Sequence, residues 1–549
     1  QKVIIVGGVA GGATAAARLR RLDEDMEIIL IERGEHISYA NCGLPYYIGG
    51  IIKNKEDLLV QTPEGMGRRF NLDIRVNNEV LKIDVDEKKV EVLDKIKGEK
   101  YFESFDKLIL SPGAEPLRPP IPGIDGANIY TLRNVPDTFK IAQHIDNKDC
   151  NNAVVVGGGF IGLEMAENLH HRGIKVTLVE MADQVMPPLD FDMAAIVHKH
   201  IKDSNIELLL GNGVEAFQHE GEKVIVQLSS GEKLETDMVM LCIGVKPEAK
   251  LALDAGLDIG ETGGIKVNEY LQTSHPDIYA VGDAIEVVDF ISGNPTLIPL
   301  AGPANKQGRI AANNICGIEE TYKGTQGTSI VKLFDLTVGV TGSNEKSLKK
   351  CNIEYMSAYT HSICHAGYYP GSTPMSIKLL FSPKEGKVLG AQIVGYQGVD
   401  KRIDVLATAI RAGMTVEDLY ELELAYAPPY SSAKDPVNMI GYVASNILSG
   451  HQSVMTWNDI DDLDRDSSLI LDVRTKEEYK TGTIPGSVNI PLDNLRDNIV
   501  KIQEYKDKEI SVFCRSGERS YIAVRILMQL GFNKVKNLTG GYLTWDMVN

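Results

Sequence analysis

The chain has 549 residues, which at roughly 150 residues per domain predicts three or four domains. Hydrophobic residues make up 43% of the sequence and charged residues 24%, as in folded globular proteins, so a disordered or fibrous chain is excluded. The formal net charge of −18 argues against a general binder of nucleic acid or of anionic membranes.

The uncharged run at the start of the chain, residues 3–17, does not predict a membrane or targeting segment. It is shorter than the roughly 18 residues of a spanning helix, and it contains glycines that the core of a signal peptide does not favour. No pair of the seven cysteines has C-x-x-C spacing, so neither a zinc ribbon nor a dithiol of the thioredoxin type is predicted, and no metal site. We expect a cytoplasmic protein with reduced thiols.

A strand, a glycine turn, a helix and a second strand open the chain. The apolar strand Lys2–Val6 runs into a turn from Gly7 to Gly12, and the next strand ends at Glu32, 25 residues after Gly7. In a dinucleotide-binding βαβ unit the glycines admit a pyrophosphate, the helix N-terminus attracts it, and the acid binds a ribose. Gly7, Gly12 and Glu32 are therefore candidate nucleotide ligands. Val9 replaces the middle glycine of the pattern, so a plain turn of an α/β sheet is the alternative.

The same order of elements returns near residue 153. An apolar strand precedes Gly157, Gly159 and Gly162, which complete the G-x-G-x-x-G pattern, and a later strand ends before Glu180, 23 residues after Gly157. A turn without a nucleotide fits this context poorly. The two units predict two dinucleotides, and Glu180 favours NADH over NADPH because a carboxylate repels the 2′-phosphate.

A third apolar strand ends in Gly282-Asp283. Together with the two βαβ units this pair resembles the flavin disulfide reductases, in which such an aspartate holds the ribityl chain of FAD; an ordinary turn at a strand end is the alternative. The resemblance implies an α/β chain with two Rossmann-like domains and an α+β dimerisation domain. The expected boundaries are 1–115 with 253–325 for the FAD domain, 116–252 for the NAD domain and 326–446 for the dimerisation domain.

A lone cysteine, Cys42, follows the first unit in the segment SYANCGLP at 38–45. Most flavin disulfide reductases carry two cysteines here, whereas a single thiol stores electrons only as a mixed disulfide, a persulfide or a sulfenic acid. It reacts as the thiolate, and we expect a nearby flavin and helix N-terminus to lower its pKa. The alternative is a buried structural cysteine.

The segment around Cys42 resembles the S-F-x-x-C-x-x-P motif of coenzyme A disulfide reductases and of related NADH oxidases and peroxidases, with Tyr39 in place of phenylalanine. The oxidases and peroxidases carry a histidine where this chain has Ala10, which favours a thiol-derived substrate here. Two arginines on one face of the first helix suit the phosphates of coenzyme A, a solvated helix face being the alternative. The resemblance implies six coenzyme A contacts: Thr14, Arg18, Arg21, Ser38, Asn41 and Lys434.

Two segments rich in tyrosine and proline lie at 367–371 and 426–434. The resemblance implies a homodimer in which Tyr368 and Tyr426 reach the active site of the partner subunit. A phenol at that place can donate a proton to a leaving thiolate. The alternative is plain packing of two aromatic loops.

The last part of the chain predicts an α/β domain at 456–549 after a linker at 447–455. A strand runs into the loop CRSGERS, which begins at Cys514, and then into a helix. Backbone amides and a helix N-terminus stabilise a thiolate or an anionic sulfur in such a loop. The segment resembles a rhodanese domain, which implies sulfur transfer by Cys514 with Arg515, Gly517 and Arg519 around it. The related dual-specificity phosphatases have arginine six residues after cysteine, not five as here; an inactive rhodanese-like domain is the alternative.

We therefore expect an enzyme that uses FAD and NADH, or NADPH, to reduce coenzyme A disulfide, coenzyme A persulfide or polysulfide. Cys42 would be the redox centre and Cys514 would transfer sulfane sulfur. Two alternatives are an NADH oxidase or peroxidase acting through a sulfenic acid of Cys42, and a flavin-binding redox sensor or docking protein.

Overall fold

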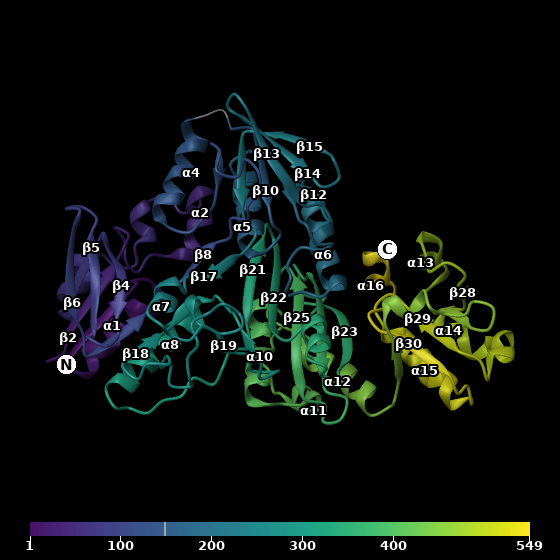
Figure 1. The fold of residues 1–549 in the computed structure, drawn as a ribbon. Coiled ribbons are helices and arrows are strands. Elements are labelled where there is room, and N and C mark those ends of the chain that lie inside the picture. Colours follow the sequence, from purple (N-terminus) through teal and green to yellow (C-terminus); the bar gives the residue numbers. More distant parts are fainter. Residues whose placement is uncertain (148–149) are drawn as a thin grey trace. The chain divides into compact units, whose positions relative to one another are not determined.

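The computed structural model describes residues 1–147 and 150–549 and groups them into two compact units. The first comprises Gln1–Val185 and Ile206–Gly327, and the second comprises Met186–Asn205 and Thr328–Asn549. Each unit contains two five-stranded sheets (Figure 1). Within the described ranges, no helix has both the length and the apolar character needed to cross a membrane.

The first sheet of the first unit is wholly parallel. Its strands are β1 (Lys2–Val6), β2 (Glu27–Glu32), β3 (Asp73–Val76), β7 (Lys107–Leu110) and β18 (Ile278–Ala280). They lie in the order β18-β7-β1-β2-β3. Inner strands such as β1 read as apolar runs because both faces of the sheet are covered. The accompanying elements are α1 (Ala10–Leu22), α2 (Leu44–Ile48), α3 (Pro63–Phe70), α7 (Lys250–Asp254), α8 (Ala301–Ile315), and the antiparallel strands β4 (Asn78–Asp84), β5 (Lys89–Asp94) and β6 (Glu99–Ser104).

The second sheet of this unit repeats the parallel arrangement. Its strands are β9 (Ile129–Tyr130), β10 (Asn152–Val156), β11 (Lys175–Val179), β12 (Glu207–Leu209) and β16 (Met238–Leu241). They lie in the order β12-β11-β10-β16-β9. The two Rossmann-like sheets are thus as predicted. The accompanying elements are α4 (Val135–Asn147), α5 (Phe160–His171), β8 (Ala114–Pro116), β13 (Val214–Glu220), β14 (Lys223–Leu228), β15 (Lys233–Thr236), β17 (Val245–Pro247), β19 (Val287–Val288) and β20 (Pro295–Thr296).

The second unit begins with an antiparallel sheet. Its strands are β21 (Ser329–Leu333), β22 (Leu336–Gly342), β23 (Met356–Ile363), β24 (Pro374–Phe381) and β25 (Val388–Gly395). They lie in the order β21-β22-β25-β24-β23, and the central β25 is buried along its whole length. The helices are α6 (Phe191–Asp203), α9 (Glu345–Lys350), α10 (Val399–Ala412), α11 (Val416–Glu421) and α12 (Pro436–Leu448). The sequence placed α6 in the NAD domain, and the structure groups it with this unit.

The last sheet is parallel. Its strands are β26 (Ser453–Met455), β27 (Leu469–Asp472), β28 (Val488–Asn489), β29 (Ile510–Phe513) and β30 (Val535–Leu538), in the order β26-β30-β29-β27-β28. The helices are α13 (Lys476–Thr481), α14 (Leu492–Leu495), α15 (Glu518–Gln529) and α16 (Gly541–Val548). The predicted linker at 447–455 overlaps both α12 and β26. Strand β26 pairs with β30, and the paired residues Ser453 and Lys536 are 83 positions apart in the chain. The three residues of β26 carry no sequence signal for such a distant partner.

Contacts within the second unit hold the last sheet against the antiparallel one. The indole of Trp457 donates to a carboxylate oxygen of Asp192 on α6 at 3.3 Å, and the same carboxylate pairs with the buried Lys378 at 2.9 Å. The imidazole of His361 on β23 lies 2.8 Å from the hydroxyl of Thr544 on α16. Because these groups are largely withdrawn from water, they set the orientation of the C-terminal sheet.

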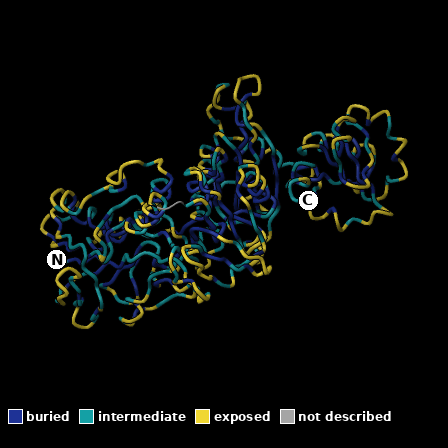
Figure 2. The backbone as a smooth tube through the Cα atoms, turned by 90° about the horizontal axis from the view of Figure 1, so that it is seen from above, coloured by how far each residue is buried: buried dark blue, intermediate teal, exposed yellow. Residues whose placement is uncertain are grey.

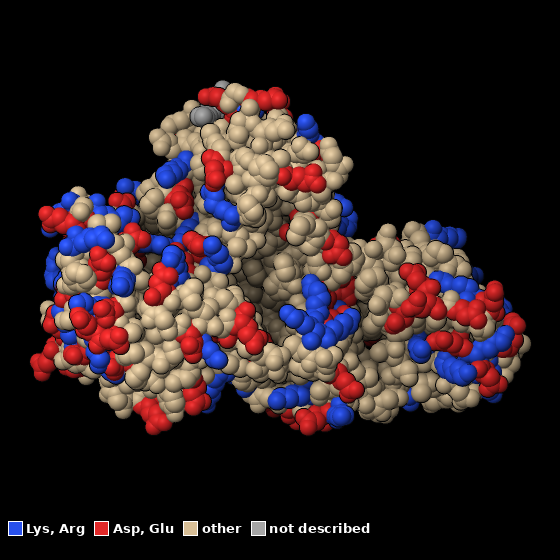
Figure 3. All heavy atoms as spheres, viewed as in Figure 1, with Lys and Arg blue, Asp and Glu red and all other residues tan. Residues whose placement is uncertain are grey.

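Burial follows the sheets, and charge is mixed on the surface. Figure 2 shows the buried stretches in the interior of the sheets and the exposed ones in outer loops. On the face seen in Figure 3, basic and acidic side chains are interspersed. The negative net charge therefore does not form a single acidic field on that face.

Candidate active site

Two glycine turns join a strand to a helix in the first unit. A Cβ atom on Gly12 would lie 1.9 Å from the carbonyl oxygen of Gly7, and a Cβ on Gly162 would lie 1.9 Å from that of Gly157. Gly7 and Gly157 have φ angles of 94° and 105°, in the region that favours glycine. The tight packing of each helix on its strand therefore requires these four residues.

The open side of each turn offers the groups that a dinucleotide needs. No side chain caps the N-terminus of α1 or α5, and the first turn of either helix carries no acid. A Cβ on Gly159 would meet no protein atom within 4 Å, so space lies in front of the second turn. Glu32 accepts from the Gly8 amide at 2.9 Å, and Glu180 from the Gly158 amide at 2.6 Å. Uncapped amides beside a carboxylate fit a diphosphate and a ribose.

Asp283 lies at the same edge of the first sheet as Gly7. It follows β18, which is parallel to β7 and β1, so the carboxyl ends of these strands meet. Burial raises the pKa of the Asp283 carboxyl, and Arg133 lowers it. A partly buried carboxylate at this edge is suited to accept hydroxyl hydrogen bonds from a polyol chain.

Cys42 lies in a short 3-10 helix, η1 (Asn41–Gly43), and is exposed. The loop is held against the first glycine turn because the Ser38 amide donates to the Gly8 carbonyl at 2.8 Å. Partial desolvation raises the pKa of the Cys42 thiol, and the carboxylates of Glu164 and Asp283 raise it further. The protein's own groups thus raise this pKa, and the lowering expected from a flavin stays a prediction. The sequence could not show this rise because both carboxylates come from distant elements.

Glu164 on α5 is a group near Cys42 that sequence reasoning missed. Burial raises the pKa of its carboxyl to about 7; the Tyr46 hydroxyl at 3.4 Å opposes the rise, and Glu167 adds to it. In the sequence Glu164 is only one of two glutamates in an otherwise largely apolar helix. No motif distinguishes it.

Glu164→Gln is expected to stabilise the protein at pH 8 and to leave its stability unchanged at pH 4. The folded carboxyl keeps its proton up to about pH 7 while the unfolded one loses it near its ordinary pKa, so the parent loses stability as pH rises between them. The gain at pH 8 should be about 2–3 kcal/mol. Urea unfolding of the holoprotein from pH 4 to 8 measures it, with the exposed Glu56→Gln as control. A difference from the parent that did not vary with pH would contradict the assignment.

The residues predicted to contact coenzyme A fall in three places. Thr14 and Arg18 on α1 donate to amide oxygens of α8 at 2.6 and 2.8 Å, while Arg21 on the same helix is exposed. Ser38 and Asn41 belong to the Cys42 loop. The sixth, Lys434, belongs to the second unit.

Tyr368 and Tyr426 are brought together although 58 residues separate them. Their hydroxyl oxygens lie 2.7 Å apart, and the side chains are 76% and 47% exposed. The hydrogen bond to Tyr368 raises the pKa of the Tyr426 phenol. Two phenols in contact can pass or share a proton at this surface.

Cys514 follows β29, and its sulfur faces hydrogen-bond donors. The Gly517 amide donates to Sγ at 3.1 Å and the Ser520 hydroxyl at 3.4 Å, and Cys514 itself is 1% exposed. Gly517 has a φ of 111° and begins α15, so glycine is required where the loop turns into the helix. One backbone amide and one hydroxyl therefore donate to the sulfur at the start of this helix.

Of the two arginines of the loop, one is already paired. Arg519 makes two hydrogen bonds of 2.7 Å to Glu478, whose pKa it holds down at about 2. Arg515 is exposed and free to meet an incoming anion. Sequence reasoning missed Glu478, whose visible signal was its place three residues after Thr475 in the capping box of α13.

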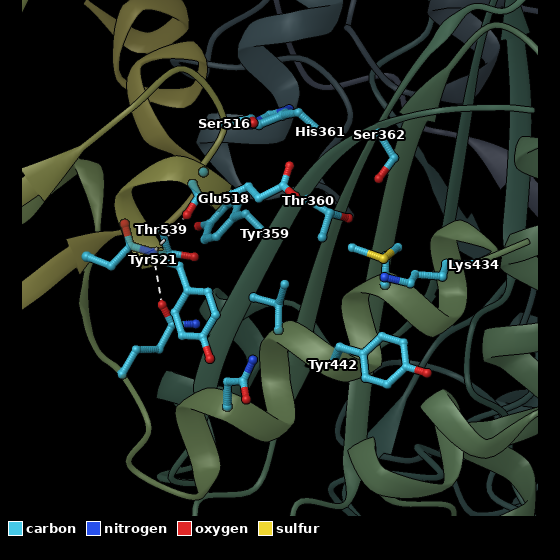
Figure 4. A pocket seen from close by; sticks show the side chains of 17 residues that line it. Tyr359, Thr360, His361, Ser362, Lys434, Tyr442, Ser516, Glu518, Tyr521 and Thr539 are labelled. Atoms are coloured by element: carbon cyan, nitrogen blue, oxygen red, sulfur yellow. Dashed lines mark hydrogen bonds between the residues drawn. The ribbon is translucent and has the colours of Figure 1, made fainter. Parts of the chain in front are cut away.

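A cavity of about 450 Å³ lies beside this loop, within the second unit. Figure 4 shows Ser516 and Tyr521 on one side of it and Lys434 on the other. Lys434, the sixth residue predicted to contact coenzyme A, therefore shares a cavity wall with the loop of Cys514.

Three family models match the chain. Pyridine nucleotide-disulphide oxidoreductase matches residues 1–308, the dimerisation domain of that family matches 328–436, and Rhodanese-like domain matches 457–547. The expected family and the fold class are confirmed. Members of the family use a flavin and a pyridine nucleotide, and the matched dimerisation domain indicates a homodimer.

Curated relatives cover the part before the rhodanese-like domain. An NADH oxidase of Methanocaldococcus jannaschii is 39% identical over 82% of this chain and 99% of its own length. A coenzyme A disulfide reductase of Staphylococcus haemolyticus is 38% identical over 81% of this chain and 100% of its own length.

Solved structures cover the chain from end to end. Reduced CoADR-RHD of Bacillus anthracis is 55% identical, with a TM-score of 0.97 over 100% of this chain and 98% of that one. A NAD-dependent persulfide reductase from A. fulgidus is 38% identical, with a TM-score of 0.92 over 99% of this chain and 100% of that one. With its two nucleotide turns, its lone Cys42 and its second thiol loop, the chain belongs to the pyridine nucleotide-disulphide oxidoreductases and carries a rhodanese-like domain at its C-terminal end.

Proposed function

We propose that the chain is an FAD-dependent, NADH-driven reductase of thiol persulfides, with coenzyme A persulfide as the first candidate and coenzyme A disulfide and polysulfide as further acceptors. The observation that carries this proposal is the presence of two separate single-thiol sites, Cys42 beside a nucleotide turn and Cys514 in an amide cradle. The likeness to the persulfide reductase of A. fulgidus over the whole chain supports the persulfide.

FAD is assigned to the first glycine turn and NADH to the second. Glu32 and Asp283 would hold the FAD ribose and ribityl chain, and Glu180 the adenosine ribose of NADH. When bound, the two coenzymes supply two electrons from NADH to the sulfur at Cys42. The amides at the start of α1 and α5 bind and orient the diphosphates.

At Cys42 the reaction begins with attack of the thiolate on the inner sulfur of the persulfide. The bond between the two substrate sulfurs breaks, hydrogen sulfide leaves with a proton, and a mixed disulfide joins Cys42 to coenzyme A. Two electrons then cleave this disulfide, and the tyrosine pair of the partner subunit protonates the leaving thiolate. The sum is NADH, a proton and a persulfide converted to NAD⁺, a thiol and hydrogen sulfide.

At Cys514 the proposed step is sulfur transfer without net redox change. Sulfane sulfur taken from a donor is held on Cys514 as a persulfide, with the Gly517 amide stabilising the anionic sulfur. A thiol entering from the side of Lys434 attacks the outer sulfur, the bond to Cys514 breaks, and the thiol proton passes to the Cys514 thiolate. The product is the persulfide that Cys42 reduces.

Anaerobic turnover with several acceptors tests this function. NADH oxidation is followed with coenzyme A persulfide, coenzyme A disulfide and polysulfide, and hydrogen sulfide is measured in parallel. We expect the highest kcat/KM with the persulfide and one hydrogen sulfide for each NADH. A stable flavin with no turnover on any sulfur acceptor would instead support a redox sensor or docking protein.

An NADH oxidase is the second candidate because a relative that is 39% identical over 82% of this chain carries that name. Ala10 leaves the first glycine loop without the histidine that would assist a sulfenic acid at Cys42. Oxygen uptake in the absence of any thiol substrate, at a rate equal to anaerobic persulfide reduction, would favour the oxidase.

NADH should be preferred over NADPH, and Glu180→Ala should reduce that preference. The carboxylate already accepts the Gly158 amide at 2.6 Å and the Ala182 amide at 2.8 Å, so it is fixed where a 2′-phosphate would lie. Removing it should lower the ratio of kcat/KM for NADH over NADPH by about 10-fold or more. Glu207→Ala, on the neighbouring strand β12, is the control. A parent enzyme that prefers NADPH would refute the assignment.

A further inference from the structure

A fully buried arginine, Arg402 on α10, lies at the base of the two tyrosine loops. Its side chain is 2% exposed and faces the carboxylate of Asp435, which is 3% exposed. The guanidinium donates to Asp435 at 2.9 Å, and the Ser431 hydroxyl donates to the same carboxylate at 2.6 Å. An ion pair this deeply buried is costly to remove from water, so stability alone does not account for it.

The nitrogen that donates to Asp435 at 2.9 Å, Nη2, also reaches both tyrosine loops. Nη2 donates to the carbonyl of Cys364 at 2.9 Å and to that of Tyr430 at 3.2 Å. Each of these carbonyls is four residues from a tyrosine of the exposed pair, Tyr368 in the first case and Tyr426 in the second. One planar group thus fixes the base of both loops.

The two loops are also joined directly, at the level of the guanidinium. The Ala366 amide donates to the Ser431 carbonyl at 2.9 Å. Beyond this point the two phenols extend into solvent, and their hydroxyl oxygens lie 2.7 Å apart. Packing constrains such exposed side chains only weakly. The distance between the two phenols therefore depends on where the bases of their loops are held.

The site is shaped for a guanidinium. A Cβ on Gly398 would lie 2.1 Å from Nη1 of Arg402, and Nη1 donates to the Gly398 carbonyl at 3.2 Å. A lysine ammonium is a single point donor and cannot hold the carbonyls of Cys364 and Tyr430 together with Asp435 in one plane.

We propose that Arg402 is the positioning residue of the tyrosine pair: by anchoring both loops it sets the contact of Tyr368 with Tyr426 that delivers a proton to the leaving thiolate. The inference rests on the proposed function, since it is through that step that the arginine affects turnover. Because Arg402 is 1% exposed, it acts through the loops and not by direct contact with a ligand.

A double-mutant cycle on the holoenzyme tests it. Tyr426→Phe should lower kcat for persulfide reduction by about 100-fold, because a positioned proton donor typically accelerates a reaction by at least that factor. Arg402→Lys should lower kcat by about 10-fold or more while KM for NADH stays within about 2-fold, because the nucleotide site is untouched. If Arg402 acts through the pair, the double variant should be no slower than Tyr426→Phe alone.

A second readout does not involve turnover. Hydrogen exchange of the holoenzyme should rise in Arg402→Lys at 364–373 and at 425–432 together, and not in β25. Ser431→Ala keeps the ion pair and removes one hydroxyl, so it is the milder variant if Arg402→Lys does not fold. Thr415→Ala, which removes the N-cap of α11 in the same sheet domain, is the control for general destabilisation.

The possible outcomes distinguish a failure of this inference from a failure of the proposed function. If Tyr426→Phe has full activity, the proton step of the proposed function fails. If Tyr426→Phe is slow but the losses multiply in the double variant, or if Thr415→Ala reproduces the exchange and kcat changes of Arg402→Lys, the positioning role is overturned and the proposed function stands.

Discussion

Replacing Cys42 with serine is expected to abolish NADH-dependent reduction of every sulfur acceptor. Serine keeps the size of the side chain but forms no mixed disulfide, so the attack on the substrate sulfur has no nucleophile. Loss of the nucleophile from a covalent mechanism typically lowers the rate by about 1,000-fold or more. Anaerobic NADH oxidation measures it, and an unchanged flavin spectrum shows that the nucleotide turns are intact.

The matched control is Cys316→Ser, a half-buried thiol of the same unit, which should keep parental activity. Intact mass of the purified protein adds an independent measurement, because coenzyme A attached to the parent should be absent from Cys42→Ser. Full activity of Cys42→Ser with all acceptors would show that the redox centre lies elsewhere.

Cys514→Ser is expected to separate the two sulfur activities. Transfer of sulfane sulfur from a donor such as thiosulfate to a thiol should fall by about 100-fold or more, since serine cannot carry a persulfide. Reduction of preformed coenzyme A persulfide by NADH should stay within about 2-fold of the parent. The physical reason is that Cys514 and Gly517 form a cradle that the NADH-driven step at Cys42 does not use.

Cys351→Ser, a thiol of the same unit at the end of α9, is the control and should retain both activities. If Cys514→Ser also lost persulfide reduction, the two thiols would act in one obligatory sequence. The proposal that Cys42 reduces free persulfide would then have to be given up.

Local sequence was sufficient for features built from neighbouring residues. The glycine turns at Gly7 and Gly157 follow from short-range rules: a strand, a residue that tolerates positive φ, and a helix that must pack closely. Cys514 was predicted for the same reason, because the strand, loop and helix around it are contiguous.

Charge and proton chemistry depended on residues far apart in the chain. Burial raises the pKa of the Cys42 thiol, and the carboxylates of Glu164 and Asp283, which come from other elements, raise it further. Arg519 looked available to a substrate and is paired with Glu478, 41 residues away. Electrostatic effects depend on distance in space, which a linear pattern does not contain.

The sequence by itself determined the family and predicted the two nucleotide turns and the two reactive thiols, because each belongs to a contiguous motif whose residues act on their near neighbours. Only the tertiary structure decided the 2.7 Å contact of Tyr368 with Tyr426 and the hydrogen bond of Arg402 to the Cys364 carbonyl. The contact between the tyrosines joins loops about 60 residues apart, and it exists because folding of the antiparallel sheet closes that distance.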